Sequence, residues 1–436
     1  MNPINVGLVG AGTVGGGVIK LLHERMEFIR GNLGVPLRIK RIADKNTERF
    51  AQVPVGDAIV SAEASDILND KEIQVVVELV GGTGFARQLI GDALRQRKHV
   101  VTANKALIAE YGYELFELAE TQGVSVNFEA AVGGGMPVIK TIREALISNR
   151  IVSVKTIING TCNYILSQMS DKGLLFDTAL KKAQKSGFAE ADPTLDIGGG
   201  DSGHKVAIMA SLIHGGYVPY NKMFIEGITG ISKEDIDYAR DLGYSIKLLG
   251  IIRRNDSESA IDVRVHPVML HHRHILASVS ENFNAVLLQG HAVGPILIYG
   301  QGAGEMPTAS AVVSDLIDVG RNILGRDEKR IPMGYYRLDN ELAIKPVEEI
   351  ESRYYLCFWV QDRPKVLASI ASLLGEHAIS IASVLQREGV QEHGVPVIFL
   401  THKARESNVR TALAEIEKLP IIRKKTHLIR IAGHDY

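Results

Sequence analysis

The sequence has little cysteine, almost no net charge and no long hydrophobic segment. Its two cysteines, Cys162 and Cys357, lie far apart and match no metal-binding spacing, which indicates a reducing, cytoplasmic setting. The net charge of −1 gives no general attraction for nucleic acid or for an anionic membrane. No apolar run reaches the roughly 18–20 residues of a membrane span, and the N-terminus lacks the features of a signal peptide. We therefore expect no nucleic-acid partner and no membrane.

The overall composition is typical of a globular protein. Of the 436 residues, 45% are apolar and 23% are charged. A chain of this length is expected to form two or three domains.

A glycine pattern near the N-terminus predicts a dinucleotide site. Residues 4–9 (INVGLV) are predicted to form a buried strand, and a helix is predicted over 18–29. Between them, G-x-G-x-x-G permits a tight turn and close approach of the backbone to a pyrophosphate at the helix N-terminus. A glycine-rich turn in an unrelated α/β protein is the alternative. The residues of the predicted turn are Gly10, Ala11, Gly12, Thr13, Val14 and Gly15.

The second predicted strand (LRIKRIAD) ends at Asp44, where an acid that binds the ribose belongs. Lys45 follows it, and Arg41 and Arg49 are near, so these cationic side chains could also bind a 2′-phosphate. The pattern therefore predicts NAD or NADP and leaves the choice open.

Two further predicted strands, 73–80 and 99–104, end in polar residues. Gly82 and Thr83 follow the first, and Lys105 follows the second. In open α/β sheets ligands bind beyond the carboxyl ends of the strands, so Lys105 is placed where a nicotinamide would lie. The alternative for Lys105 is a solvated lysine in the first turn of a helix.

A carboxylate, Glu129, lies in an apolar segment over 124–132 that is predicted to be a strand and is followed by three glycines. It is either a buried acid bonded to backbone amides or an oxygen ligand for a hard cation. The sequence alone leaves both readings open.

The segment GFAEADPTLDIGGGDSGHKVAIMASL, residues 187–212, combines four carboxylates and a lysine with a long apolar run. Asp201 and Lys205 are four residues apart and share one helix face. A helix cap or a surface salt bridge is the plain explanation. However, VAIMASLI is apolar all round, so the helix is predicted to be buried, and charges at its start are costly without partners. A lysine beside carboxylates suits proton transfer to a small amine-bearing alcohol or aldehyde.

Two other features are weaker candidates. Cys162 could be the thiolate nucleophile of an acylating aldehyde dehydrogenase, although no local motif supports this. The histidines of HHRH (271–274) could bind metal, but a solvated cluster or one at a pocket rim is favoured.

These residues carry a resemblance that covers essentially the whole chain. It is similar to homoserine dehydrogenase, in the bacterial form with a C-terminal regulatory domain. The similarity rests on GLVGAGTVGGGV, VTANKALIA, FEAAVGGGMPVI, NGTCNYIL and GFAEADPTLDIGGGDSGHK. The last matches E-x-D-P-x-x-D-x-x-G-x-D-x-x-x-K without a gap. The resemblance implies NAD(P)-dependent interconversion of L-homoserine and L-aspartate 4-semialdehyde, in threonine, methionine and isoleucine biosynthesis.

The resemblance also implies residue roles. Lys205 would donate the proton to the aldehyde, and Lys105 would assist near substrate and nicotinamide. Asp201 would orient the hydroxyl or a water. Glu190 would bind the substrate's amino group, in a pocket that Gly187 and Asp196 complete. A monovalent cation, Na⁺, would be held by Glu129 and by the carbonyls of Val132, Gly134 and Met136.

The predicted fold class is α/β with three domains. Residues 1–138 form a Rossmann-type dinucleotide-binding domain, and in the family a segment from about 300–340 completes it, with Gly302 near the cofactor. Residues 139–299 form an α+β catalytic and dimerisation domain. A βαββαβ order over 353–432 predicts a ferredoxin-like fold that resembles an ACT domain.

The resemblance at the C-terminus has one departure. The family pattern is D-R-P-G-V-L, but Lys365 replaces the glycine, which bears on effector binding because glycine allows φ > 0 and close approach. The resemblance implies a threonine effector, and the β-rich middle domain is expected to make a homodimer or homotetramer. A non-catalytic dinucleotide and amino-acid sensor is the alternative function, although such sensors tend to lose proton-transfer residues that are all in place here.

Overall fold

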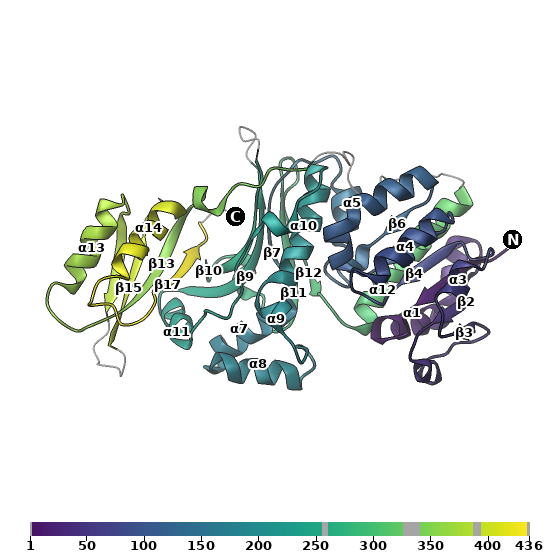
Figure 1. Cartoon of the computed structure of the whole chain (residues 1–436), viewed down its shortest axis with the longest axis horizontal. Coiled ribbons are helices and arrows are strands. Elements are labelled where there is room, and N and C mark those ends of the chain that lie inside the picture. Colours follow the sequence, from purple (N-terminus) through teal and green to yellow (C-terminus); the bar gives the residue numbers. More distant parts are fainter. Residues whose placement is uncertain (1, 255–259, 326–340, 387–393, 434–436) are drawn as a thin grey trace.

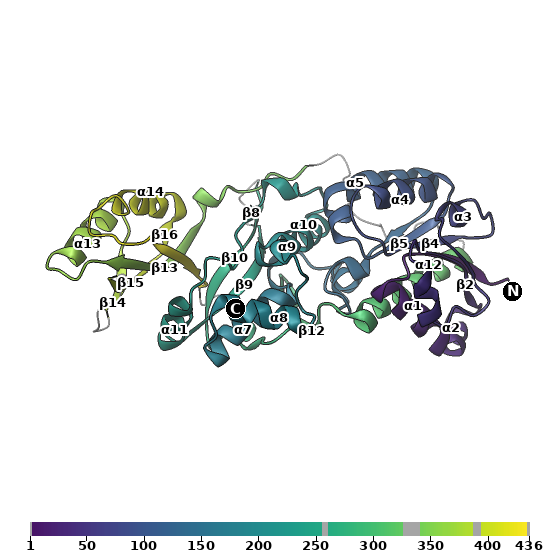
Figure 2. The same cartoon turned by 60° about the horizontal axis from the view of Figure 1, so that its bottom comes forward.

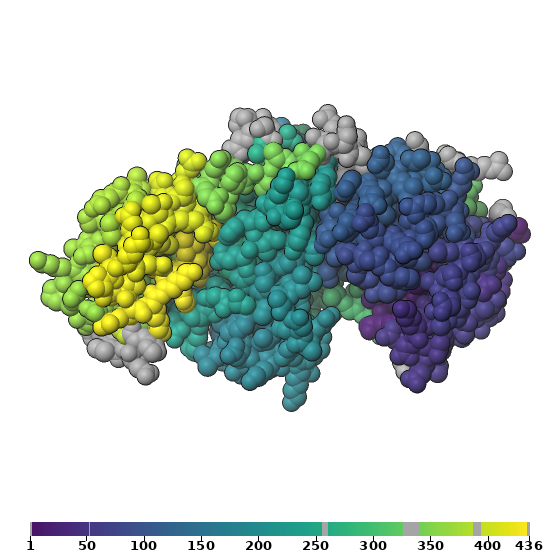
Figure 3. Space-filling view, in the orientation of Figure 1, coloured from purple at the N-terminus to yellow at the C-terminus, as the bar shows by residue number. Residues whose placement is uncertain are grey.

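The computed structural model describes residues 2–254, 260–325, 341–386 and 394–433. The chain forms three parts in a row along its longest axis (Figures 1 and 3). The N-terminal part lies at one end, the part that begins near residue 151 lies in the middle, and the C-terminal part lies at the other end.

The N-terminal part is built on a six-stranded parallel sheet. The strand order β3-β2-β1-β4-β5-β6 is that of a Rossmann fold, with β1 and β4 side by side where the order reverses. The predicted fold of this part is therefore confirmed. The strands are β1 (Ile4–Val9), β2 (Leu37–Ala43), β3 (Ile59–Ser61), β4 (Val75–Glu78), β5 (His99–Thr102) and β6 (Val126–Asn127).

Helices cover both faces of this sheet because successive strand residues point to opposite sides. Val77 belongs to one buried cluster with Val18 of α1, whereas Val76 belongs to another with Leu107 of α5. Helix α12 comes from far along the sequence yet packs against α1, where Lys20 pairs with Glu305 at 2.7 Å. The helices are α1 (Thr13–Glu24), α2 (Met26–Leu33), α3 (Ser65–Leu68), α4 (Phe85–Arg95), α5 (Lys105–Gln122) and α12 (Glu305–Gly325).

Two predicted elements of this part were wrong. The helix over 18–29 is instead two helices, α1 and α2, which are separated at Arg25. The strand over 124–132 is reduced to β6, and Glu129 lies in a short 3-10 turn, Glu129–Ala131. The reason is a distant contact, because the backbone N–H of Glu129 donates to Asp315 of α12 at 2.8 Å rather than to a neighbouring strand.

The middle part contributes five long or medium strands of a large mixed sheet and most of the helices in front of it (Figure 2). Helix α10 is buried along almost its whole length, as its all-round apolar sequence predicted. The strands are β7 (Ile151–Ile157), β9 (Tyr244–Arg253), β10 (Asp262–His271), β11 (Phe283–Gly290) and β12 (Gly294–Gln301), with the short β8 (Phe224–Ile225) beside β10. The helices are α7 (Gly160–Lys172), α8 (Phe176–Lys185), α9 (Thr194–Ile197), α10 (Gly200–His214) and α11 (Lys233–Asp241), and the short α6 (Val138–Lys140) lies in the connection before β7.

The C-terminal part has the order β17-β13-β15-β14 with two helices, which is the ferredoxin-like arrangement that the sequence predicted. It is not a separate sheet, because β17 also pairs in parallel with β10 through Val268 and Arg430. One eleven-stranded sheet therefore crosses both parts. The elements are β13 (Glu351–Val360), α13 (Val366–Glu376), β14 (Ile381–Gln386), β15 (Val395–Thr401), β16 (Ala404–Arg405), α14 (Glu406–Ile416) and β17 (His427–Ile431).

Parts of all three predicted domains lie outside the described residues. They include 255–259, within the predicted catalytic domain, 326–340, within the segment predicted to complete the dinucleotide domain, and 387–393, within the predicted ACT domain. Among the helices that the structure describes, none is both long and apolar enough to cross a membrane.

Candidate active site

The glycine turn between β1 and α1 is shaped by two close backbone approaches. Gly10 has φ +99°, and a Cβ on it would lie 2.8 Å from the carbonyl of Leu79. A Cβ on Gly15 would lie 2.0 Å from the carbonyl oxygen of Gly10. Only glycine fits at either position, and the N-terminus of α1 has no side-chain cap. The backbone N–H groups at the start of α1 therefore suit an anion.

Asp44 closes this turn from the end of β2. Its carboxylate accepts from the backbone N–H of Ala11 at 2.7 Å and pairs with Arg49 at 3.0 Å. Burial opposes ionisation, but the backbone hydrogen bonds and Arg49 together lower the pKa of Asp44. A cavity of about 530 Å³ lies against Gly10, Gly12, Asp44, Lys45 and Arg49.

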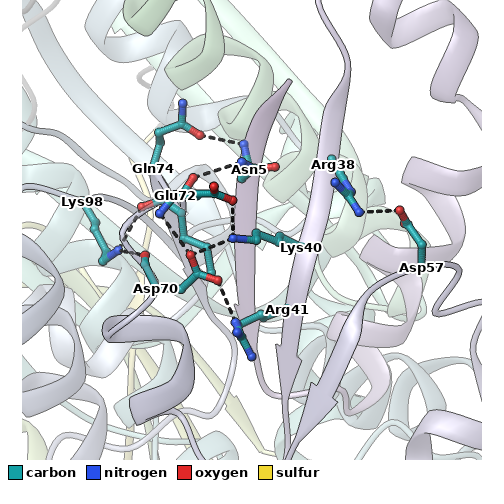
Figure 4. A network of polar contacts seen from close by, with 10 residues as sticks. Asn5, Arg38, Lys40, Arg41, Asp57, Asp70, Glu72, Gln74 and Lys98 are labelled. Carbon is teal, nitrogen blue, oxygen red and sulfur yellow. Dashed lines mark hydrogen bonds and ion pairs between the residues drawn. The ribbon is translucent and has the colours of Figure 1, made fainter. Parts of the chain in front are cut away.

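Arg41 does not join this cavity, contrary to prediction. It points to Asp70, with its Nε 2.8 Å from a carboxylate oxygen, and Lys40 holds the other oxygen at 2.8 Å (Figure 4). The pairing of β1 with β2 shifts register here, since Val6 pairs with Ile39 and Gly7 with Arg41, so the usual alternation is interrupted and both Lys40 and Arg41 reach Asp70. Arg49, which lies in a 3-10 turn after the strand, takes the place beside Asp44.

The ends of β4 and β5 are joined by a buried carboxylate that the sequence analysis missed. Glu78 accepts from the hydroxyl of Thr102 at 2.6 Å and from the N–H groups of Val80 and Gly81 at 2.8 and 2.9 Å. The amide of Asn104 donates to the carbonyl of Gly82 at 2.7 Å and caps α5. The loop with Gly82 and Thr83 is thereby fixed, although neither residue lines the cavity beside Asp44. The sequence did contain an indication of this role, because Glu78 is a charged residue at the end of an otherwise apolar strand.

The central feature of the site is one carboxylate that holds two lysines. Asp201 lies in the first turn of α10 and is 2% exposed. Lys105 Nζ lies 2.9 Å from its Oδ1, and Lys205 Nζ lies 2.7 Å from its Oδ2. Lys205 also donates to the carbonyl of Ile158 at 2.9 Å. Asp201 makes no side-chain cap, so the capping alternative is wrong.

The charges at this centre depend on one another. Burial opposes ionisation of Asp201, but Lys205 and Lys105 hold its pKa well below the usual range. Burial also opposes the charge on Lys105, yet Asp201 raises the pKa of that ammonium group. Asp201 is therefore a carboxylate, and Lys105 is an ammonium group, near neutral pH.

A second carboxylate, Asp196, lies next to Asp201. Burial, and then the charge of Asp201, raises the pKa of Asp196. The amide nitrogen of Asn159 donates to both carboxylates, at 2.7 Å to Asp196 and 2.8 Å to Asp201. Asn159 was not among the residues predicted for the site, because it meets both carboxylates only in the folded chain.

The thiol of Cys162 is not an activated nucleophile. It is 0% exposed and donates to the backbone carbonyl of Asp196 at 3.2 Å. Burial first, and then the nearby carboxylates, raises the pKa of Cys162 well above its ordinary value. The thiolate hypothesis is therefore wrong for this site.

Glu190 and Gly187 lie on the exposed segment between α8 and α9. Gly187 has φ +74°, and the carbonyl of Glu190 accepts from the side chain of Gln184 at 3.1 Å. The charge of Glu190 also helps to raise the pKa of Lys105, after the larger effects of Asp201 and Asp196.

Glu129 lies in a second buried polar region. Its carboxylate accepts from the N–H groups of Ile139 and Lys140 at 2.9 and 2.8 Å. Burial, together with Asp315, raises the pKa of Glu129 to about 7. The adjacent loop contains Val132, Gly134 and Met136, and Gly134 packs against the backbone of Gly302, outside the cavity beside Asp44.

The described residues contain no group of three or more His, Cys, Asp or Glu side chains placed to hold a metal ion. In the HHRH segment, ring nitrogens of His271 and His274 accept backbone N–H groups at 3.2 and 3.1 Å.

A Rossmann sheet with an anion-binding turn, next to a buried lysine–carboxylate centre, defines a nicotinamide-dependent oxidoreductase. Comparisons with known proteins identify the family within this class. Residues 137–317 match the family described as homoserine dehydrogenase, 10–129 match its NAD-binding domain, and 354–421 match the ACT domain. Homoserine dehydrogenases of Neisseria gonorrhoeae and Pseudomonas aeruginosa are each 43% identical, over 100% and 97% of this chain and 100% and 98% of theirs. A homoserine dehydrogenase structure from Thiobacillus denitrificans has a TM-score of 0.93 at 45% identity and covers 99% of both chains.

The chain belongs to the homoserine dehydrogenase family. It is an NAD(P)-dependent oxidoreductase acting on a CH–OH group, and it interconverts L-homoserine and L-aspartate 4-semialdehyde. This reaction belongs to the biosynthesis of threonine, methionine and isoleucine. Nothing in the comparisons supports the alternative of a non-catalytic sensor.

Proposed function

We propose that Lys205 exchanges the proton with the substrate oxygen and that Lys105 assists beside it. The observation that carries this assignment is the pairing of both ammonium groups with the two oxygens of Asp201. A buried lysine held by a carboxylate is oriented and stays near the reacting oxygen. Asp201 fixes both lysines and orients the hydroxyl or a water.

Substrate binding is assigned to the acidic residues around this centre. Glu190 binds the substrate's ammonium group, and Asp196 completes the anionic wall, since carboxylates are the natural partners of an amine. Gly187, with φ +74°, supplies the turn that carries Glu190 toward the pocket.

The cofactor is NADP or NAD, and NADP is the better match. Arg49 and Lys45 line the cavity next to Asp44, so two cations are available for a 2′-phosphate. Gly10 to Gly15 would hold the pyrophosphate at the start of α1. The nicotinamide, when bound, supplies or accepts the hydride, and Lys105, Gly82, Thr83 and Gly302 are assigned to its end of the site.

A monovalent cation, Na⁺, is assigned to Glu129 and to the carbonyls of Val132, Gly134 and Met136. The supporting observation is a buried carboxyl whose ionised form is disfavoured by burial and by Asp315. A hard cation would stabilise that form, and oxygen donors are its preferred ligands. In this position the ion would stabilise the loop in which Gly134 contacts Gly302.

We further assign the chain to a homodimer or homotetramer in the cytoplasm. Strand β12 ends the large sheet, and Tyr299 within it and Val293 just before it are 53% and 48% exposed, which supports pairing with a second chain. Both cysteines are buried and free, which suits a reducing compartment. The domain boundaries proposed are 1–138 with about 300–340, then 139–299, then 353–432.

A threonine effector is assigned to the ACT domain. Lys365 has φ +74°, so the loop keeps the left-handed conformation that glycine provides in the family pattern. Its side chain is exposed at the start of α13 and does not fill the domain core.

The proton-transfer assignment is tested with Lys205→Ala. Turnover of L-homoserine, followed at the nicotinamide absorbance with NADP and with NAD, is expected to fall at least about 100-fold. The Kd for NADP is expected to stay within about twofold, because Lys205 lies in the other domain. Lys222→Ala, which removes an exposed lysine paired with Glu341, is the control and should match the wild type. Unchanged turnover in Lys205→Ala would refute the assignment.

A further inference from the structure

Asn159 lies where β7 passes into α7 and is 5% exposed. Its side chain makes three contacts with different functions. The oxygen accepts from the backbone N–H of Cys162 at 2.7 Å and caps α7. The nitrogen donates to Asp196 at 2.7 Å and to Asp201 at 2.8 Å. A cap alone would use only the oxygen, so the amide nitrogen has a separate role.

Two neighbouring carboxylates normally repel each other and compete for one proton. Because one nitrogen binds an oxygen of each, Asp196 and Asp201 are held at a fixed separation with a donor between them. The residue before Asn159 reinforces this arrangement, since the carbonyl of Ile158 accepts from Lys205. One two-residue segment therefore holds Lys205 and both carboxylates.

We infer that Asn159 is a positioning residue for proton transfer, which keeps Asp201 aligned with Lys205 by donating to Asp201 and Asp196 together. The inference rests on the roles proposed for Lys205 and Asp201. Asn159 acts through these groups and is not assigned a contact with substrate or cofactor.

The surroundings give this role a measurable pH signature. A change at Asn159 alters the protonation equilibria of the groups that interact with Asp196 and Asp201. These groups include Lys105, Cys162, His204, Lys205 and Tyr220, and Glu190 in turn acts on Lys105. An amide favours ionised carboxyls, whereas a third carboxylate at position 159 would disfavour them.

Two substitutions separate the cap from the donor. Asn159→Ser keeps a good N-cap oxygen but cannot reach both carboxylates with an amide. It is expected to lower kcat by about 10-fold, the loss that removal of a charge-assisted hydrogen bond implies, with KM for NADP within about twofold. Asn159→Asp keeps the cap and is expected to move the acid limb of the kcat/KM profile up by about one pH unit.

The decisive experiment is the pH profile of kcat/KM for wild type and both variants, with thermal denaturation to verify folding. If Asn159→Asp does not fold, Asn159→Ser carries the test. Wild-type kcat and an unmoved profile in the folded variants would overturn the inference and leave Asn159 as a cap only. Lys205→Ala is measured in parallel. If it abolishes turnover while the Asn159 variants behave as wild type, only the role of Asn159 fails, whereas wild-type turnover in Lys205→Ala removes the proposed function itself.

Discussion

Lys105 and Asp201 come from two different domains and meet at 2.9 Å. Lys105 begins α5 of the dinucleotide-binding part, and Asp201 lies in the first turn of α10 in the middle part. A second contact between the same helices joins Glu110 and His204 at 3.3 Å. The relative position of the two parts therefore sets the geometry of this lysine–carboxylate centre.

Arg49 should govern the choice of cofactor. Arg49→Ala removes the cation beside Asp44 and is expected to raise KM for NADP by about 10-fold while KM for NAD changes within about twofold. The matched control is Arg41→Ala, because Arg41 binds Asp70, which keeps Lys40 as a partner. Initial rates with both cofactors test this. A larger effect on NADP in Arg41→Ala than in Arg49→Ala would contradict the assignment.

The contact between the C-terminal part and α11 should depend on pH. His427 pairs with Asp235 at 2.7 Å, and this hydrogen bond raises the pKa of His427 above its ordinary 6.5. The pair therefore stabilises the fold fully below about pH 6.5, and this contribution is lost as pH rises through the folded-state pKa. His427→Gln is expected to lower Tm by about 2–4 °C at pH 6 and by less at pH 9.

The control for this effect is His402→Gln, which changes an exposed histidine of the same domain. Its Tm should follow the wild type at both pH values. A deficit in His427→Gln that is equal at pH 6 and pH 9 would show that the charge on His427 does not matter.

Lys365 is expected to make the fold less stable than a glycine at the same position would. A lysine with φ +74° carries a steric penalty that glycine avoids, and the greater freedom of glycine in the unfolded chain offsets part of it. Lys365→Gly is expected to raise the free energy of unfolding by about 0.5–1 kcal/mol in denaturant titrations. Arg363→Gly, in the same loop but without a positive φ, should destabilise instead. A loss of stability in Lys365→Gly would argue against this strain.

Cys162 should be dispensable for chemistry. Cys162→Ser keeps a donor for the carbonyl of Asp196 in nearly the same volume, so kcat is expected to stay within about twofold. The wild type should also keep its turnover after treatment with a thiol-alkylating reagent, because the thiol is fully buried. A rate loss of several orders of magnitude in Cys162→Ser would restore the thiolate mechanism.

Local patterns allowed the first part of the site to be predicted. The glycine turn and Asp44 follow from their places in one strand–helix–strand unit, and the pairing of Asp201 with Lys205 follows from helix periodicity. Both are short-range relationships that a sequence displays directly.

Contacts between distant segments could not be predicted. Asn159 reaches residues 37 and 42 positions away, and Glu129 leaves its predicted strand because Asp315 binds it from 186 positions away. Arg41 and Arg49 lie on either side of Asp44 in sequence, and only the folded structure shows that Arg41 turns to Asp70 while Arg49 pairs with Asp44. The continuation of the large sheet from β10 into β17 likewise depends on pairing that no local pattern encodes.

The central claim is that Asp201 holds both lysines for proton transfer, and Asp201→Asn tests it most directly. This substitution keeps the shape of the side chain but leaves two lysines beside a neutral amide. We predict that kcat for L-homoserine with NADP falls at least about 100-fold while NADP still binds, and that the folded protein loses about 3 kcal/mol of stability. A folded Asp201→Asn enzyme with wild-type kcat would contradict the account.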